Sequence, residues 1–252
     1  MNKSVRNKHL LLFDIDGTLT KSRLKIQPSM IECLNKARKH FDLAIVGGSD
    51  RDKQIDQLGD ITYLFNYAFS ENGTLSFKGK KEFHRNSFAK FLGENKLKEL
   101  INFCLQVVIE TDIPVKRGTF LEYRNGMLNC SVIGRNCTQE ERMQFVEYNK
   151  THDIQNKVAQ RIRDKFDKDG VYVSVGGQIS VDIFPKGWDK TYCLQFIDKE
   201  YEDIHFFGDK VYKGGNDFEI YEHERTIGHD VKGDPEETIR QIEAVMKSYG
   251  YN

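Results

Sequence analysis

Two carboxylates stand one residue apart, directly after an apolar run, in the segment LLLFDIDGTLT. Side chains at positions i and i+2 of an extended segment point to the same face, so Asp14 and Asp16 can both reach one small ligand. Gly17 lets the chain turn sharply and lets the backbone approach that ligand closely. Ligands of open parallel sheets bind beyond the carboxyl ends of the strands. The segment therefore predicts a ligand site where a buried strand ends.

The elements that must position these acids alternate along the chain. Short apolar runs and amphipathic stretches follow one another, which is the pattern of a parallel sheet with crossover helices. The expected strands are residues 9–13, 42–48, 62–69, 204–208 and 225–229, and the expected helices are residues 27–41, 190–196 and 234–248.

A different pattern begins near residue 85 and ends at Gly187, after which the first pattern returns. This stretch predicts a mixed α+β insert. It contains an expected helix over 88–105, a hairpin turning at Asn125-Gly126, a helix from Thr138 to residue 167, and two strands around Gly176-Gly177. We therefore expect an α/β fold: a Rossmann-like parallel-sheet core of residues 1–85 and 188–252, with an inserted α+β cap of residues 86–187.

Composition limits the partners that the protein can have. The 252 residues can form two domains, and 38 Lys and Arg balance 38 Asp and Glu, so no overall field attracts nucleic acid or an anionic membrane. Five cysteines without a CxxC pair are typical of reduced thiols in a cytosolic protein. The apolar run before Asp14 is too short for a signal-peptide core, and no segment approaches membrane-spanning length. We expect a cytoplasmic protein that binds neither nucleic acid nor membranes.

The segment FDIDGTLT resembles the first motif of the haloacid dehalogenase-like phosphotransferases, and three further motifs match in order. They contain Ser49 in AIVGGSD, Lys190 in GWDK and Asp209 in FFGDK. The resemblance implies that Asp14 is a nucleophile that forms an aspartyl phosphate. It implies that Asp16 protonates the leaving oxygen and later deprotonates the incoming hydroxyl, while Lys190 and Ser49 hold phosphoryl oxygens. Any one of these acids alone is more typical of a cap or a turn, but the four motifs together are not.

The same resemblance implies a Mg²⁺ ion, because a dianionic phosphate would be repelled by the Asp14 carboxylate. Magnesium prefers hard oxygen ligands in an octahedron. Asp14, the backbone carbonyl of Asp16 and Asp209 would supply them. Asp217, in the segment GGND, would support the metal from close by.

Three arginines of the insert are candidates for binding a second phosphate, since the planar guanidinium can bind phosphate bidentately. Arg124 stands beside the hairpin turn, Arg135 ends the following strand, and Arg142 lies one turn into the helix that starts near Thr138. From their spacing alone, three solvated surface charges are an equally good interpretation. Among the phosphotransferases that the motifs resemble, a sugar phosphomutase needs a second phosphate-binding group of this kind, because its sugar bisphosphate carries a phosphate at each end.

Three long segments, RGTFLEYRNGMLNCSVIGRNCTQEER, GGQISVDIFPKGWDK and FFGDKVYKGGNDFEIY, closely resemble the eukaryotic-type phosphomannomutase family. The likeness runs from residue 11 to residue 228. It implies a second, structural cation site that involves Tyr221 and Thr226, although His223 stands where the family usually has an aspartate. The substrate-binding residues that it implies are Arg23, Arg124, Arg135, Arg142, Ser180 and Asp182.

This resemblance implies an enzyme that interconverts mannose 6-phosphate and mannose 1-phosphate and supplies GDP-mannose synthesis. The cycle would start with Asp14 phosphorylated by a hexose 1,6-bisphosphate activator. The resemblance further implies a cytosolic homodimer joined through the caps. Two alternatives stay open: a Mg²⁺-dependent sugar-phosphate phosphatase on the same fold, and a catalytically silent binding protein, against which the intact Asp14, Asp16, Lys190 and Asp209 argue. The glucose isomers also remain candidate substrates.

Overall fold

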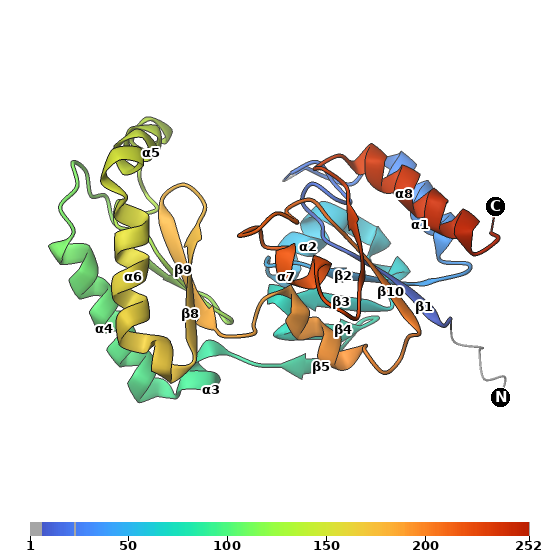
Figure 1. The fold of residues 1–252 in the computed structure, drawn as a ribbon, viewed down its shortest axis with the longest axis horizontal. Coiled ribbons are helices and arrows are strands. Elements are labelled where there is room, and N and C mark those ends of the chain that lie inside the picture. The colour runs from blue at the N-terminus through green and yellow to red at the C-terminus, as the bar shows by residue number, and fades with distance from the viewer. Residues whose placement is uncertain (1–6, 23, 252) are drawn as a thin grey trace. The chain divides into compact units, whose positions relative to one another are not determined.

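The chain forms two units, and one is inserted into the other (Figure 1). The computed structural model describes residues 7–22 and 24–251. The first unit contains the described residues up to Arg85 and those from Gly187 onward, and the inserted unit is Asn86–Lys186. None of the described helices combines the length and the apolar character needed to cross a membrane.

A largely parallel sheet forms the first unit, which confirms the expected α/β class. Among the described residues its strand order is β11-β10-β1-β2-β3-β4-β5. The strands from β11 to β3 pair in parallel, while β4 and β5 add an antiparallel edge. The strands are β1 (His9–Phe13), β2 (Asp42–Val46), β3 (Tyr67–Ser70), β4 (Leu75–Lys78), β5 (Lys81–Arg85), β10 (Asp203–Gly208) and β11 (Ile227–Asp230).

Strand β1 is covered on both faces, which explains its continuous apolar sequence. Leu11 and Phe13 belong to one buried cluster, together with side chains of α1 (Pro28–Ala37) and α8 (Pro235–Ser248). Leu10 and Leu12 belong to a second cluster on the other face. Figure 1 shows α1 and α8 side by side over the sheet. The strand that Asp14 follows is therefore packed on both faces.

Two expected elements of the first unit are wrong in part. The expected strand over residues 62–69 begins only at Tyr67, because Gly59–Leu64 forms a 3-10 helix whose apolar side chains pack into the core. The expected helix at Lys190–Phe196 is also a 3-10 helix. Short apolar runs do not distinguish a strand from a helical turn by periodicity. The helices α2 (Arg51–Leu58) and α7 (Phe218–Tyr221) and the strands β4 and β5 were not expected.

The inserted unit has an antiparallel sheet with strand order β6-β7-β9-β8 among its described residues. Helices α4 and α6 pack on one face of this sheet (Figure 1). The expected hairpin and the capping box at Thr138 are confirmed, and the two long expected helices are each broken once, at Gly93 and at Asp153. The elements are α3 (Phe88–Leu92), α4 (Glu94–Glu110), β6 (Leu121–Tyr123), β7 (Leu128–Cys130), α5 (Gln139–His152), α6 (Ile154–Phe166), β8 (Val171–Gly176) and β9 (Ser180–Pro185).

Candidate active site

The carboxyl ends of β1 and β10 bring two of the candidate acids together. The strands are parallel neighbours, and the backbone N–H of Asp14 donates to the carbonyl of Phe207 at 2.9 Å. Asp14 follows β1 and Asp209 follows β10. Gly17 has a φ of +83°, and a Cβ built on it would lie 2.5 Å from Oδ2 of Asp209. Glycine is therefore required here both by the turn and by the close approach of Asp209.

A buried lysine joins the acids into a cluster. Oxygen atoms of Asp14, Asp209 and Asp217 all lie within 4.8 Å of one another. Nζ of Lys190, whose side chain is 1% exposed, donates to Oδ1 of Asp14 and to Oδ1 of Asp217. Oδ2 of Asp217 accepts the backbone N–H groups of Asp209 at 3.1 Å and Lys210 at 3.0 Å. Asp217 thus fixes both the lysine and the loop that follows β10.

The charges of this cluster are not balanced. Burial raises the pKa of Asp14 to about 7, although the charge of Lys190 opposes the rise. Burial also raises the pKa of Asp209. Burial acts on Asp217 as well, but Lys190 and the backbone donors outweigh it and lower the pKa of that carboxyl. Burial opposes the charged form of Lys190, but its two carboxylate partners raise its pKa, so it stays charged. Three acids therefore share one buried ammonium, an arrangement that favours an added cation.

The donor set fits a hard divalent cation such as magnesium. Asp14, Asp209 and Asp217 offer hard carboxylate oxygens, which are the ligands that Mg²⁺ prefers. A divalent cation would also lower the pKa of Asp14 and of Asp209, which burial raises.

Asp16 is held differently from Asp14. Its carboxyl is half-buried, and Oδ1 accepts a hydrogen bond from Nε2 of Gln57 at 2.8 Å. Gln57 lies on α2, which follows β2. The side chain of Asp16 is therefore held from α2, while its neighbour Asp14 binds Lys190.

Two of the candidate arginines in the inserted unit contact one acid. Nη2 of Arg124 lies 2.9 Å from Oε2 of Glu122, and Nε of Arg135 lies 2.7 Å from the same oxygen. The structure thus brings these two guanidinium groups together on the sheet. Arg142 lies in the first turn of α5, where its backbone N–H donates to the carbonyl of Thr138.

The other two candidates on this sheet also meet at a shared partner. Nδ2 of Asn129 donates to Oγ of Ser180 at 2.9 Å and to Oδ1 of Asp182 at 2.6 Å. Burial raises the pKa of Asp182, although the bond from Asn129 and the charges of Arg124 and Arg135 oppose the rise. Hydroxyl, carboxyl and guanidinium groups on one face form a polar surface suited to a sugar phosphate.

A family model described as eukaryotic phosphomannomutase matches residues 30–248. A phosphomannomutase from Dendrobium officinale is 52% identical, over 92% of this chain and 92% of that protein. The chain belongs to the eukaryotic phosphomannomutase family. The phosphomannomutase of Arabidopsis thaliana is 49% identical, over 95% of this chain and 97% of its own length. The family predicted from the motifs is confirmed.

Solved structures show the fold that this phosphomannomutase family member shares with a wider group. A sugar phosphatase of the HAD superfamily, subclass IIB, matches with a TM-score of 0.60 at 18% identity, over 96% of this chain and 99% of that one. The protein SMU.1108c from Streptococcus mutans matches with a TM-score of 0.66 at 15% identity, over 96% of this chain and 99% of its own. These likenesses agree with the predicted haloacid dehalogenase-like fold.

Two candidate residues of this family member remain, Ser49 and Arg23. Ser49 lies in the loop between β2 and α2, and its carbonyl accepts the N–H of Glu71 at 3.0 Å. Arg23 lies outside the described residues.

The residues of the expected second cation site lie at the end of α7 and in the turn that follows it. Oγ1 of Thr226 donates to the carbonyls of Ile220 and His223, and Nδ1 of His223 accepts the N–H of Arg225 at 3.1 Å. Tyr221 packs against Gly228, where an added Cβ would meet its ring at 2.5 Å. Ligation of a second cation by Tyr221 and Thr226 stays a prediction.

Sequence reasoning missed several side chains that contact candidate residues, and three of them bear on the site. They are Gln57 beside Asp16, Glu122 between two arginines, and Asn129 between Arg135, Ser180 and Asp182. For Asn129 the sequence contains a signal, since it is a polar residue between two apolar ones in an expected strand. Leu128 and Cys130 face the core, so Asn129 points to the opposite face of the sheet, as Ser180 and Asp182 do.

Proposed function

We propose that the chain is a phosphomannomutase that interconverts mannose 6-phosphate and mannose 1-phosphate. It transfers the phosphoryl group through an aspartyl phosphate on Asp14 and a hexose 1,6-bisphosphate intermediate, which also serves as the activator. The proposal rests chiefly on one observation: Asp14 is buried at the end of β1 and bound to Lys190. The chain is also about 50% identical to phosphomannomutases over nearly its full length. A buried, ion-paired carboxylate in this position is suited to be a nucleophile.

The chemical steps are assigned to two acids. A carboxylate oxygen of Asp14 attacks phosphorus, the P–O bond to the enzyme forms, and the bond to the donor oxygen breaks. Asp16 gives a proton to that leaving oxygen and takes the proton of the hydroxyl that accepts the phosphoryl group in the second half of the cycle. Its hydrogen bond from Gln57 supports an oriented carboxyl. Lys190 and Ser49 bind phosphoryl oxygens, and the charge of Lys190 also opposes the rise that burial causes in the pKa of Asp14.

Asp14, Asp209, Asp217 and the backbone carbonyl of Asp16 are proposed to hold Mg²⁺. The ion, when bound, would screen the repulsion between the phosphate and the nucleophile and would help to orient the phosphoryl group. The excess of negative charge in the cluster and its hard oxygen donors support this assignment.

The first unit is proposed as the haloacid dehalogenase-like core and the inserted unit as the substrate-binding cap. Arg124, Arg135 and Arg142 bind the phosphate that is not being transferred, and Ser180 and Asp182 bind sugar hydroxyls. The shared polar face of four of these residues supports this assignment. Arg23 is assigned to substrate binding from the family resemblance alone.

The test of the activity is a coupled assay with mannose 1-phosphate and glucose 1-phosphate, each with and without glucose 1,6-bisphosphate. A mutase forms the 6-phosphate isomer when the bisphosphate is present and releases little inorganic phosphate. A sugar-phosphate phosphatase releases phosphate and forms no isomer, and the comparisons do not favour it. Release of phosphate without isomer formation would overturn the proposal.

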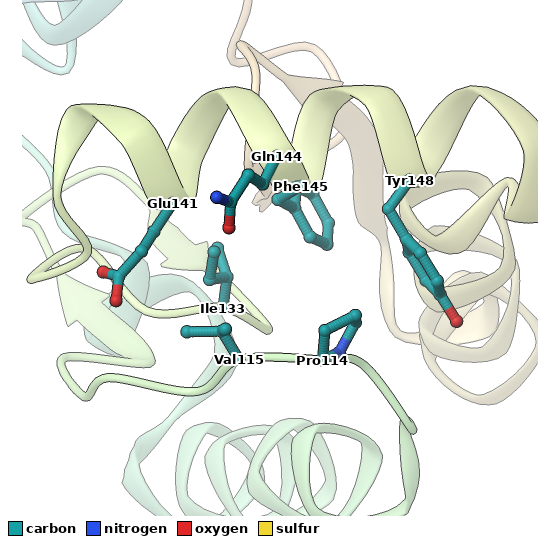
Figure 2. A pocket seen from close by; sticks show the side chains of 7 residues that line it. All are labelled: Pro114, Val115, Ile133, Glu141, Gln144, Phe145 and Tyr148. Atoms are coloured by element: carbon teal, nitrogen blue, oxygen red, sulfur yellow. The ribbon is translucent and has the colours of Figure 1, made fainter.

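We also propose that the enzyme is a cytoplasmic homodimer joined through the inserted unit, supplying mannose 1-phosphate for GDP-mannose synthesis. Apolar surface on this unit supports the dimer, including Ile109, which is 77% exposed. Figure 2 shows a pocket beneath α5 lined by Pro114, Val115, Ile133, Glu141, Gln144, Phe145 and Tyr148. Light scattering should give twice the mass of one chain, and a monomer at assay concentration would contradict this state.

A further inference from the structure

A row of polar side chains crosses one face of the sheet in the inserted unit. Val181 and Ile183 of β9 point into the apolar core, so Asp182 between them points to the opposite face. The register places Asn129 of β7 directly opposite Asp182, and places Glu122 of β6 directly opposite Asn129. Asn129 therefore occupies the middle of this row.

Every polar group of the Asn129 amide has a partner in the row. Its Oδ1 accepts a hydrogen bond from Nη1 of Arg135 at 3.0 Å. Its Nδ2 donates to Oγ of Ser180 at 2.9 Å and to Oδ1 of Asp182 at 2.6 Å. An amide nitrogen has two N–H donors, and both are used. The residue is 3% exposed, so water does not easily replace these partners.

The charges around the amide allow only one orientation. If the amide were reversed, its carbonyl would face the Asp182 carboxylate and its NH₂ group would face the Arg135 guanidinium. Both contacts would be repulsive, and buried donors and acceptors would lose their partners. The observed orientation instead gives the anion a donor and the cation an acceptor. One amide side chain thus binds a guanidinium, a carboxylate and a hydroxyl group at once.

We propose that Asn129 is a positioning residue for substrate recognition, which orients Arg135 for a phosphate and the Ser180–Asp182 pair for sugar hydroxyls without itself touching the substrate. The inference rests on the proposed function, because that function assigns Arg135, Ser180 and Asp182 to the substrate. Without the amide of Asn129, Asp182 loses the hydrogen bond from Nδ2, and Arg135 loses its bond to Oδ1 while its ion pair with Glu122 remains. Both groups then leave the geometry that a bound hexose phosphate requires.

The test compares Asn129→Ala and Asn129→Asp with a matched control, Asn156→Asp. Asn156 is exposed on α6, and its Nδ2 donates to Oδ1 of Asp153 at 2.7 Å, outside the polar row. The KM for mannose 1-phosphate should rise about tenfold or more in Asn129→Ala, with a smaller change in kcat, because three oriented hydrogen bonds are lost. The control should keep the KM of the unchanged enzyme.

The pH dependence of Asn129→Asp separates positioning from a merely structural role. The introduced carboxyl faces Asp182 on β9, Glu122 on β6, and the guanidinium groups of Arg124 and Arg135. When it is ionised it has no donor for Asp182 and repels that carboxylate, whereas its protonated form regains one donor. The KM of this variant, relative to that of the unchanged enzyme, should therefore fall as the pH is lowered.

Three results decide the outcome. A KM for Asn129→Ala within about twofold of the unchanged enzyme, or a pH-independent KM ratio for Asn129→Asp, would overturn the inference. If Asn129→Ala fails to fold by circular dichroism, Asn129→Ser replaces it in the same comparison. Absence of mutase activity in the unchanged enzyme would instead overturn the proposed function, so the two failures are distinguishable.

Discussion

Replacing Lys190 by methionine tests the buried charge cluster most severely. The lysine side chain is 1% exposed and binds carboxylate oxygens of Asp14 and Asp217, which are themselves buried. Methionine keeps most of the side-chain volume and removes the charge. Removing one partner of a buried ion pair costs about 3–5 kcal/mol, because the remaining charge stays buried without compensation. Here two carboxylates lose the same partner, so we expect a loss in the upper part of that range.

The assay is urea unfolding near pH 7.5, followed by circular dichroism, with and without Mg²⁺. The exposed Lys199 provides the control, since Lys199→Met makes the same chemical change away from the buried cluster. We expect Lys190→Met to lose stability without metal and to recover more of it on adding Mg²⁺ than the unchanged enzyme gains. We also expect it to lose mutase activity. Burial already raises the pKa of Asp14, and the variant lacks the Lys190 charge that opposes this rise.

The reasoning would be refuted by a stable and active Lys190→Met variant. Unfolding at the same urea concentration as Lys199→Met would mean that the two carboxylates do not need the ammonium. Equal stabilisation of both variants by Mg²⁺ would mean that the cation does not bind near this charge.

Three further predictions concern other parts of the site. Arg142→Ala should lower kcat/KM about tenfold or more, as expected for a charge-assisted phosphate contact worth about 1.5–3 kcal/mol. Unchanged kinetics would mean that Arg142 is a solvated surface charge that does not contact the substrate. Gln57→Leu should lower kcat about tenfold with little change in KM, because Asp16 loses its orienting hydrogen bond; a selective rise in KM would contradict this. Mg²⁺ should bind more weakly at about pH 6 than at about pH 8 in calorimetric titrations. Burial raises the pKa of Asp14 to about 7 and also raises that of Asp209, so the ion must displace protons at the lower pH. Equal affinity at the two pH values would exclude these residues as ligands.

The parts of the fold that the sequence predicts are those set by local patterns. Strand β1 is a continuous apolar run, and α8 begins at an Asp-Pro pair that caps and starts a helix. The capping box at Thr138 is likewise a signal within four residues. In contrast, α2 has the sequence RDKQIDQL and buries only Gln54 and Leu58, so it lacks the apolar periodicity by which a helix is recognised.

The parts of the site that sequence reasoning misses depend on contacts between distant segments. Asn129 meets Ser180 and Asp182 only because β7 and β9 pair in one register, 51 to 53 residues apart along the chain. Gln57 reaches Asp16 across 41 residues and from a helix that was not expected. Spacing within a motif says nothing of such pairs, whereas Asp14 and Asp16 could be found because they share one strand end.

The most direct test of the central claim is the site of covalent phosphorylation. The enzyme would be mixed with radiolabelled glucose 1,6-bisphosphate and Mg²⁺ and quenched, and the acyl phosphate would be reduced with borohydride and located by mass spectrometry. The account predicts modification of Asp14 in the unchanged enzyme and none in Asp14→Asn, which should also lack turnover because a neutral amide is a poor nucleophile. Mutase activity with no modification of Asp14, or with the phosphoryl group on another residue, would contradict it.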